Sequence, residues 1–293
     1  MQWTTARFTI DLSAPKVMGI VNATPDSFSE TGNHLATTRA ALAHCEQLLL
    51  DGADILDIGG ESTRPGALPV PVAQELERVL PVVREAVKLG VPVSVDTYKP
   101  AVMQAVLDLG ADIINDIWAL RWTEPGTVLS GTNVVLQHPG CGVSLMHMHG
   151  NPMTMQIAPM EGDVLPQVLQ FLHHQSEVLC RLGVQKTQIV IDPGIGFGKT
   201  VAQNFELLAR QQELLDLGYP LLAGWSRKSS LAAVTNLVKD LSPKSANHPR
   251  MIPSVVAALL AVERGAGIVR VHDVRETVQA LQVLHAISSL GNK

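Results

Sequence analysis

Short apolar runs alternate with longer amphipathic stretches along the whole chain. The runs span residues 16–22, 54–59, 92–96, 112–116, 143–147, 188–192, 220–224 and 267–272. The helix-like stretches between them include residues 36–50, 72–89, 100–109, 164–182, 201–217 and 274–290. Regular alternation of strand and helix patterns predicts repeated βα units, and therefore a parallel sheet.

One short pattern recurs where a helix should stop and a strand should start. The strings DGADILD, LGADIIND and RGAGIVR begin at Asp51, Leu109 and Arg264, and each places a glycine at the expected helix end. Eight strands in 293 residues fit a closed barrel better than a doubly wound sheet, which usually has fewer strands or a second domain. We therefore expect an α/β protein with a (β/α)8 TIM barrel, in which residues 1–293 form a single domain. A doubly wound sheet is the alternative.

Composition narrows the class of protein. Hydrophobic residues make up 46% of the chain and charged residues 17%, which is typical of a soluble globular protein. A net charge of -5 gives no basic surface for nucleic acid, and no apolar stretch is long enough to predict a leader or a membrane span. Three widely separated cysteines predict neither a disulfide framework nor a zinc ribbon. We expect a cytoplasmic protein that binds neither nucleic acid nor membrane.

Polar residues follow nearly every predicted strand. They are Asn22, Glu61 to Arg64, Asp96, Asn115, His147, Asp192, Lys228, and Arg270 with His272. An Asp or Asn after one strand usually caps the next helix, but no cap requires the cations at 228, 270 and 272. In a parallel barrel, the loops after the strand carboxyl ends build the active site. The pattern therefore predicts a single polar site at one mouth.

Eight ordered segments carry a family resemblance. They are MGIVNATPDSFSETG, GADILDIGGESTRPGA, VSVDTYKP, IINDI, LMHMHGNP, IDPGIGFGKT, GWSRKS and RVHDV. Their order and spacing resemble the signature segments of dihydropteroate synthases over nearly the whole chain. The resemblance implies condensation of (7,8-dihydropterin-6-yl)methyl diphosphate with p-aminobenzoate to give 7,8-dihydropteroate and diphosphate in folate biosynthesis. It also implies Mg2+ as cofactor and a homodimer formed through late helices, including the apolar stretch 252–262.

The pterin site can be predicted partly from chemistry. A pterin presents an N3–H and a 2-amino group side by side, and a buried carboxylate such as Asp192 can accept from both. The resemblance adds Asn115 and Lys228 as polar partners, Asp96 at the reacting edge, and Met146 and Phe197 against the ring. It assigns catalytic roles to Asp96, Lys228 and Arg270.

The diphosphate and the amine need different surroundings. Arg270 and His272 lie two apart in a strand and so share a face, where their charge can stabilise the leaving group. The resemblance adds Arg64 and Asn22 to the diphosphate site, and makes Asn22 a ligand of Mg2+. It assigns p-aminobenzoate binding to Phe28, Thr63, Pro65 and Ser229.

Two other functions on the same barrel are alternatives. A methyltetrahydrofolate:corrinoid methyltransferase would need a corrinoid protein partner and would have little use for Arg64, Arg270 and His272. A non-catalytic pterin binder should have lost at least one residue of the expected site, and all are present.

GIGFGKT is not a Walker phosphate loop, because the position of its first glycine holds Pro193. Departures from the family pattern include the large Trp225 before SRKS and a long segment at 122–142.

Overall fold

The computed structural model describes residues 1–24, 34–63, 66–124, 126–235 and 248–291. Within them, eight parallel strands form a barrel in the order β8-β7-β6-β5-β4-β3-β10-β9, and a parallel bridge between Ile191 and Leu221 connects the two ends. The strands are β3 (Lys16–Asn22), β4 (Ile55–Gly59), β5 (Val93–Asp96), β6 (Ile113–Asp116), β7 (Gly142–Met146), β8 (Ile189–Asp192), β9 (Leu222–Ala223) and β10 (Ile268–Val271). The predicted (β/α)8 fold is confirmed.

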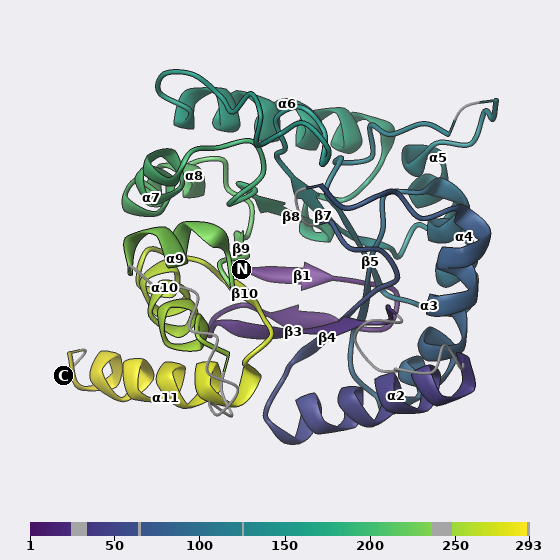
Figure 1. Ribbon diagram of the computed structural model, residues 1–293, viewed down its shortest axis with the longest axis horizontal. Helices are drawn as coiled ribbons and strands as arrows, with labels where there is room; N and C mark the ends of the chain where they lie inside the picture. The colour runs from purple at the N-terminus through teal and green to yellow at the C-terminus, as the bar shows by residue number, and fades with distance from the viewer. Residues whose placement is uncertain (25–33, 64–65, 125, 236–247, 292–293) are drawn as a thin grey trace.

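Helices surround the strands on the outside (Figure 1). They are α2 (His34–Leu50), α3 (Val72–Ala86), α4 (Pro100–Asp108), α5 (Gly131–Gln137), α6 (Leu165–Leu182), α7 (Val201–Ala209), α8 (Gln212–Leu215), α9 (Ser229–Val234), α10 (Met251–Glu263) and α11 (Val274–Gly291), with 3-10 turns η1 (Val87–Leu89) and η2 (Lys186–Gln188). None of the helices described is both long and apolar enough to span a bilayer.

Two helical regions differ from the sequence prediction. The expected helix 201–217 is divided into α7 and α8. At the break, the buried side chain of Gln211 donates to the carbonyls of Ala261 and Arg264 at 2.8 and 3.1 Å. The long segment 122–142 contains helix α5, whose N-cap Ser130 accepts a hydrogen bond from the backbone of Asn133. This helix supplies the unit between β6 and β7 that the sequence pattern obscured.

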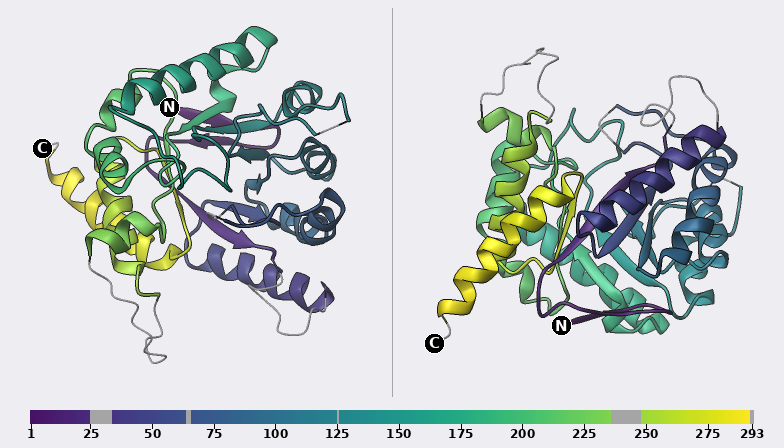
Figure 2. Two further views of the ribbon diagram at one scale, coloured as in Figure 1. Left: turned by 45° about the horizontal axis from the view of Figure 1, so that its top comes forward. Right: turned by 90° about the horizontal axis from the view of Figure 1, so that it is seen from below.

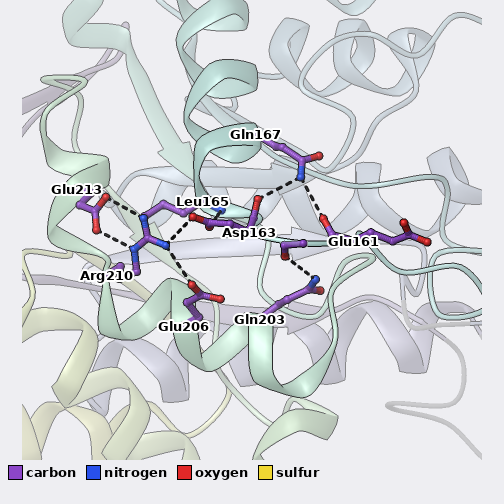
Figure 3. Close-up of polar contacts among 9 residues, drawn as sticks. Glu161, Asp163, Leu165, Gln167, Gln203, Glu206, Arg210 and Glu213 are labelled. Carbon is purple, nitrogen blue, oxygen red and sulfur yellow. Dashed lines mark hydrogen bonds and ion pairs between the residues drawn. The ribbon is translucent and has the colours of Figure 1, made fainter.

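A network of surface charges lies at the break between α7 and α8 (Figure 3). The guanidinium of Arg210 bonds to the carboxylates of Glu206, Glu213 and Asp163 at 2.8 to 3.0 Å. Asp163 lies just before α6, so the network ties the start of this helix to α7 and α8. Exposed ion pairs of this kind contribute little stability.

An N-terminal hairpin covers one end of the barrel, and the sequence pattern did not predict it. Strands β1 (Gln2–Thr4) and β2 (Thr9–Asp11) pair antiparallel and lie across the barrel (Figure 2). Trp3 is fully buried, and its indole N–H donates to the Gln188 carbonyl at 2.9 Å. It packs with inward-facing side chains of six strands: Met18, Ile55, Ile113, Val190, Leu222 and Ile268. Apolar packing therefore closes the end of the barrel where the strands begin.

Further along the strands, the inward positions become polar. Side chains two residues apart on a strand share a face, so Asp57 follows Ile55 inward and Asn115 follows Ile113. Strand register then places Gly59, Asp96 and Asn115 side by side at the carboxyl ends. The fold thus separates an apolar floor from a polar mouth.

We predict that Trp3→Ala lowers the free energy of unfolding by about 3–5 kcal/mol, because it leaves a cavity in the floor of the barrel. Urea denaturation measures the change. Val128→Ala, at a side chain that is 98% exposed, is the control and should change it by less than about 0.5 kcal/mol. Equal stability of Trp3→Ala and the wild type would mean that the hairpin does not support the barrel.

Candidate active site

Arg270 connects three strands at the centre of the mouth. From β10, its Nε donates to Asp57 Oδ2 of β4 at 2.5 Å and its Nη2 donates to Asp96 Oδ2 of β5 at 2.6 Å. Asn115 of β6 donates to the same Asp57 oxygen at 3.3 Å. The structure therefore brings together three of the predicted residues, Asp96, Asn115 and Arg270, around one carboxylate.

Asp57 is a residue that the sequence analysis missed. It is fully buried, and its Oδ1 has no hydrogen-bond partner among the residues that the structure describes. It lies inside the apolar run ILDIG and not at the end of a strand, so the pattern of polar residues at strand ends does not include it. The sequence signal for Asp57 was its position two residues before Gly59, the last residue of the strand. Residues two apart on a strand face the same way, so Asp57 faces the mouth as Gly59 does.

Asp96 has an unusual proton affinity. Burial raises the pKa of its carboxyl group to about 7, opposed by the neighbouring Arg270 guanidinium and reinforced by the charge of Asp57. A carboxyl group with such a pKa can hold or release a proton near neutral pH. Perturbed groups of this kind are typical of functional sites.

A tight turn fixes the orientation of Asp192 at the end of β8. The backbone N–H of Gly194 donates to Asp192 Oδ1 at 2.7 Å. Gly194 has a φ of 68°, and a Cβ there would lie 1.9 Å from the carbonyl oxygen of His147, so only glycine fits. Burial raises the pKa of Asp192, and the charges of Lys228, Lys199 and Arg270 oppose this shift. The predicted turn and the predicted binding role are therefore compatible.

Lys228 interacts electrostatically with this carboxylate. Its ammonium sits 4.3 Å from the centre of the Phe197 ring, and burial lowers its pKa to about 8 while the charge of Asp192 opposes the shift. The preceding Arg227 has a left-handed backbone, with φ 58°, and its side chain is paired with Asp273 at 2.6 Å. This conformation and ion pair fix the backbone from which Lys228 extends.

An apolar wall borders the charged groups. Met146 and Phe197 are buried in one cluster with Tyr98, Ile117, Met148 and Met155. The structure thus places the two apolar residues of the predicted pterin site together. Tyr98 is a further member that the sequence analysis did not assign.

Lys199 is a second buried cation that the sequence analysis missed. Its ammonium donates to the carbonyls of Gly194 and Phe197 at 2.9 and 3.2 Å and lies 3.0 Å from Nδ1 of His147. Burial and this positive neighbour lower the pKa of His147 to about 2, so its ring is neutral and accepts. Lys199 belongs to GIGFGKT, where it holds the glycine turn from behind.

The remaining predicted residues lie around the same mouth or outside the described residues. Asn22 ends β3 beside Gly59, and Thr63 is half-buried in the segment after β4. The hydroxyl of Ser226, next to β9, lies 2.9 Å from Nδ1 of His272, while Ser229 begins α9 and is exposed. Phe28, Arg64 and Pro65 fall outside the residues that the structure describes.

Comparison with known proteins decides between the functions that such a mouth could serve. Residues 18–272 match the model of the pterin binding enzyme family. A dihydropteroate synthase of Neisseria meningitidis serogroup B is 45% identical over 289 residues, which cover 97% of both chains. The chain belongs to the dihydropteroate synthase family.

Solved structures of the dihydropteroate synthase family agree with this assignment. The Xanthomonas albilineans enzyme with 4-aminobenzoic acid is 44% identical, with a TM-score of 0.85 and coverage of 98% of this chain and 99% of that one. The Burkholderia cenocepacia enzyme complexed with 7,8-dihydropteroate is also 44% identical, with a TM-score of 0.84 and coverage of 99% and 98%. The predicted resemblance to dihydropteroate synthases is confirmed.

We predict that Arg270→Met destabilises the protein by about 3–5 kcal/mol at pH 8, because it leaves Asp57 and Asp96 facing each other without a cation. The loss should be smaller at pH 5.5. Without Arg270 the folded-state pKa of Asp96 rises further above its unfolded value, so stability is kept at low pH and lost as the pH rises.

Urea denaturation at both pH values tests this prediction. Arg210→Met, which removes the exposed network of Figure 3, is the control and should have a much smaller effect with little change between the two pH values. An Arg270→Met protein that is equally destabilised at pH 5.5 and pH 8 would contradict the assigned coupling.

Proposed function

We propose that this chain catalyses the condensation of (7,8-dihydropterin-6-yl)methyl diphosphate with p-aminobenzoate, giving 7,8-dihydropteroate and diphosphate. The single observation that carries the proposal is the composition of the mouth of the barrel. The buried carboxylate of Asp192, the Asn115 amide, the Lys228 ammonium and the Arg270 guanidinium lie there beside an apolar wall. These groups match a flat heterocycle with a donor edge and a charged leaving group. The relatives crystallised with 4-aminobenzoic acid and 7,8-dihydropteroate support the same substrates.

Asp192, Asn115 and Lys228 would bind the polar edges of the pterin. The Asp192 carboxylate would accept from N3–H and the 2-amino group, and the Gly194 turn holds it in one orientation. Lys228 would donate to O4 and N5, while Met146 and Phe197 would cover the faces of the ring. The positive charge of Lys228 beside Asp192 keeps that carboxyl group nearer its ionised, accepting form.

Arg270 and His272 would stabilise the diphosphate as its bond to the pterin methylene breaks. Substitution at that carbon has strong cationic character, because the pterin ring delocalises the charge. Asp96 would lie at the reacting edge, where its carboxylate stabilises the positive ring and Arg270 sets its orientation. The arylamine then attacks the methylene, and its proton can pass to water or to diphosphate.

Mg2+ would bind mainly through the diphosphate. Asn22 offers one amide oxygen at the end of β3, and no cluster of three acidic, His or Cys side chains suited to a metal occurs among the described residues. This donor set fits an ion that keeps water and substrate oxygens as most of its ligands. When bound, Mg2+ would supply positive charge to the departing diphosphate.

Thr63 and Ser229 would hold the p-aminobenzoate, together with Phe28 and Pro65 from the segments outside the described residues. Arg64, also outside them, would bind the diphosphate. We also propose a cytoplasmic homodimer. The exposed side chains of Ile252 and Val256 on α10 support pairing through this helix. A corrinoid-dependent methyltransferase is not favoured, since the relatives that match nearly the whole chain are dihydropteroate synthases.

The proposed activity is tested by mixing the protein with the pterin methyl diphosphate, p-aminobenzoate and Mg2+ and measuring diphosphate release. Release should depend on the amine and yield 7,8-dihydropteroate. Asp192→Asn should weaken pterin binding by at least about tenfold, because an amide N–H then faces a donor edge. No amine-dependent product from the wild type would refute the function, and unchanged pterin affinity in Asp192→Asn would refute the role of Asp192.

Pterin affinity should fall as the pH rises above about 8. The ammonium of Lys228 titrates there, and the neutral amine loses its charge-assisted hydrogen bonds. Binding that requires the protonated form weakens by at most about tenfold per pH unit above the pKa. Pterin titrations from pH 6.5 to 9.5 measure this, and Lys228→Met should bind weakly with a flatter profile. A profile of Lys228→Met that falls as steeply as that of the wild type would assign the titration to another group.

A further inference from the structure

A buried cluster of charges lies beside the mouth, where the chain leaves β4. The ammonium of Lys99, just after β5, contacts the carboxylates of Glu61 and Glu75. The three side chains are 4%, 9% and 1% exposed. The cluster therefore holds Glu61, the first residue of the segment 61–70, against α3 and the end of β5. Nothing in the proposed chemistry uses these charges.

Tyr98 adds a hydrogen bond to this cluster. Its hydroxyl donates to Glu61 Oε1 at 3.1 Å, and its ring meets the ring of Trp122 edge-on with centroids 5.1 Å apart. The other carboxylate oxygen, Glu61 Oε2, accepts from the backbone N–H of Val70 at 3.0 Å. One carboxylate thus binds Tyr98, Lys99 and the far end of its own segment.

The residue before Glu61 is fixed as well. A Cβ on Gly60 would lie 2.7 Å from Val79 Cγ1, which shows how closely this backbone packs on α3. Arg78 of α3 donates to the Gly60 carbonyl at 2.8 Å. Glu61 is therefore held through its carboxylate and through the backbone of the preceding residue, and Thr63 is only two residues away.

Tyr98 also belongs to the apolar cluster that contains Met146 and Phe197. Its ring packs in the wall proposed for the pterin, while its hydroxyl holds the carboxylate at the base of the segment that carries Thr63. One side chain thus connects the two halves of the proposed substrate site. Packing of the ring in the wall does not require the hydroxyl, so the bond from this hydroxyl to Glu61 is a separate contact.

We propose that Tyr98 and Glu61 are positioning residues that set the place of residues 61–63 relative to the pterin wall, and thereby the affinity for the amine substrate. The inference rests on the proposed function, because it concerns the second substrate of that reaction. The Tyr98 hydroxyl and the Glu61 carboxylate act through the backbone of Thr63. Neither group needs to touch the reacting atoms.

The two tyrosines of the chain provide a matched pair of variants. Tyr98→Phe keeps the ring against Trp122 and removes only the hydroxyl bonded to Glu61. Tyr219→Phe removes the other hydroxyl, which lies 3.6 Å from Cys180 Sγ on the far side of the barrel from Tyr98. Glu61→Gln keeps the shape of the side chain and removes its charge.

Steady-state kinetics and pterin titration without amine separate the substrates. Tyr98→Phe should raise the KM for p-aminobenzoate by about threefold to tenfold, less than the full loss of one hydrogen bond to a charged group, because the hydroxyl acts on the amine site only through the backbone of Thr63. The pterin dissociation constant should stay at the wild-type value, and Tyr219→Phe should leave both unchanged. Glu61→Gln should raise the amine KM at least as much as Tyr98→Phe. An unchanged amine KM in Tyr98→Phe, or a pterin dissociation constant that rises with it, overturns the proposal.

Hydrogen exchange at the Val70 amide tests the same contact without substrate. The exchange should be faster in Tyr98→Phe than in the wild type and unchanged in Tyr219→Phe; equal rates in Tyr98→Phe and the wild type overturn the proposal. If the wild type shows no amine-dependent diphosphate release, the proposed function fails. The Val70 measurement then still decides whether Tyr98 fixes this segment.

Discussion

The bond between Arg270 and two carboxylates is the interaction on which the mouth of the barrel depends. Arg270 belongs to β10, which pairs with β3, and its guanidinium reaches past β3 to Asp57 and Asp96 on the next two strands. This geometry exists only when the strands hold their register around the barrel. A buried pair of this kind adds little net stability, since desolvation offsets the attraction, but the loss of one partner is costly. Its main effect is orientation, because it fixes the Asp96 carboxylate and balances its charge.

The same barrel separates stability from chemistry along each strand. At the end closed by the hairpin, Trp3 and the apolar inward side chains form a floor that excludes water. At the other end, the inward positions carry carboxylates, an amide and cations, whose pKa values are shifted by burial and by one another. Lys228 and Asp96 titrate near neutrality, at about 8 and about 7. The closed floor is what makes those shifts possible, since an open barrel would admit water and screen the charges.

The sequence predicted the strands and most of the polar mouth, because the strand pattern and the polar residues at strand ends are local signals. Asp57 was missed because its importance comes from Arg270, 213 residues later in the chain. Lys199 was missed for a similar reason, since its partners are backbone carbonyls that no residue pattern encodes. The hairpin at Trp3 was missed because three-residue strands are too short to show a period. Local patterns thus predicted the fold, and long-range contacts determined the rest of the site.

The two proposed substrate sites differ in how they are held, and this difference has a consequence for specificity. The pterin residues Asp192 and Asn115 lie on strands, where the backbone ladder fixes them. Thr63 lies in a segment after β4, and its place depends on the side-chain contacts of Glu61 with Tyr98, Lys99 and the Val70 amide. A site held by the sheet tolerates little variation, whereas one held by side chains can change through a single substitution. Loss of the hydroxyl at position 98, with the ring kept in the wall, should therefore alter recognition of the amine before it alters recognition of the pterin.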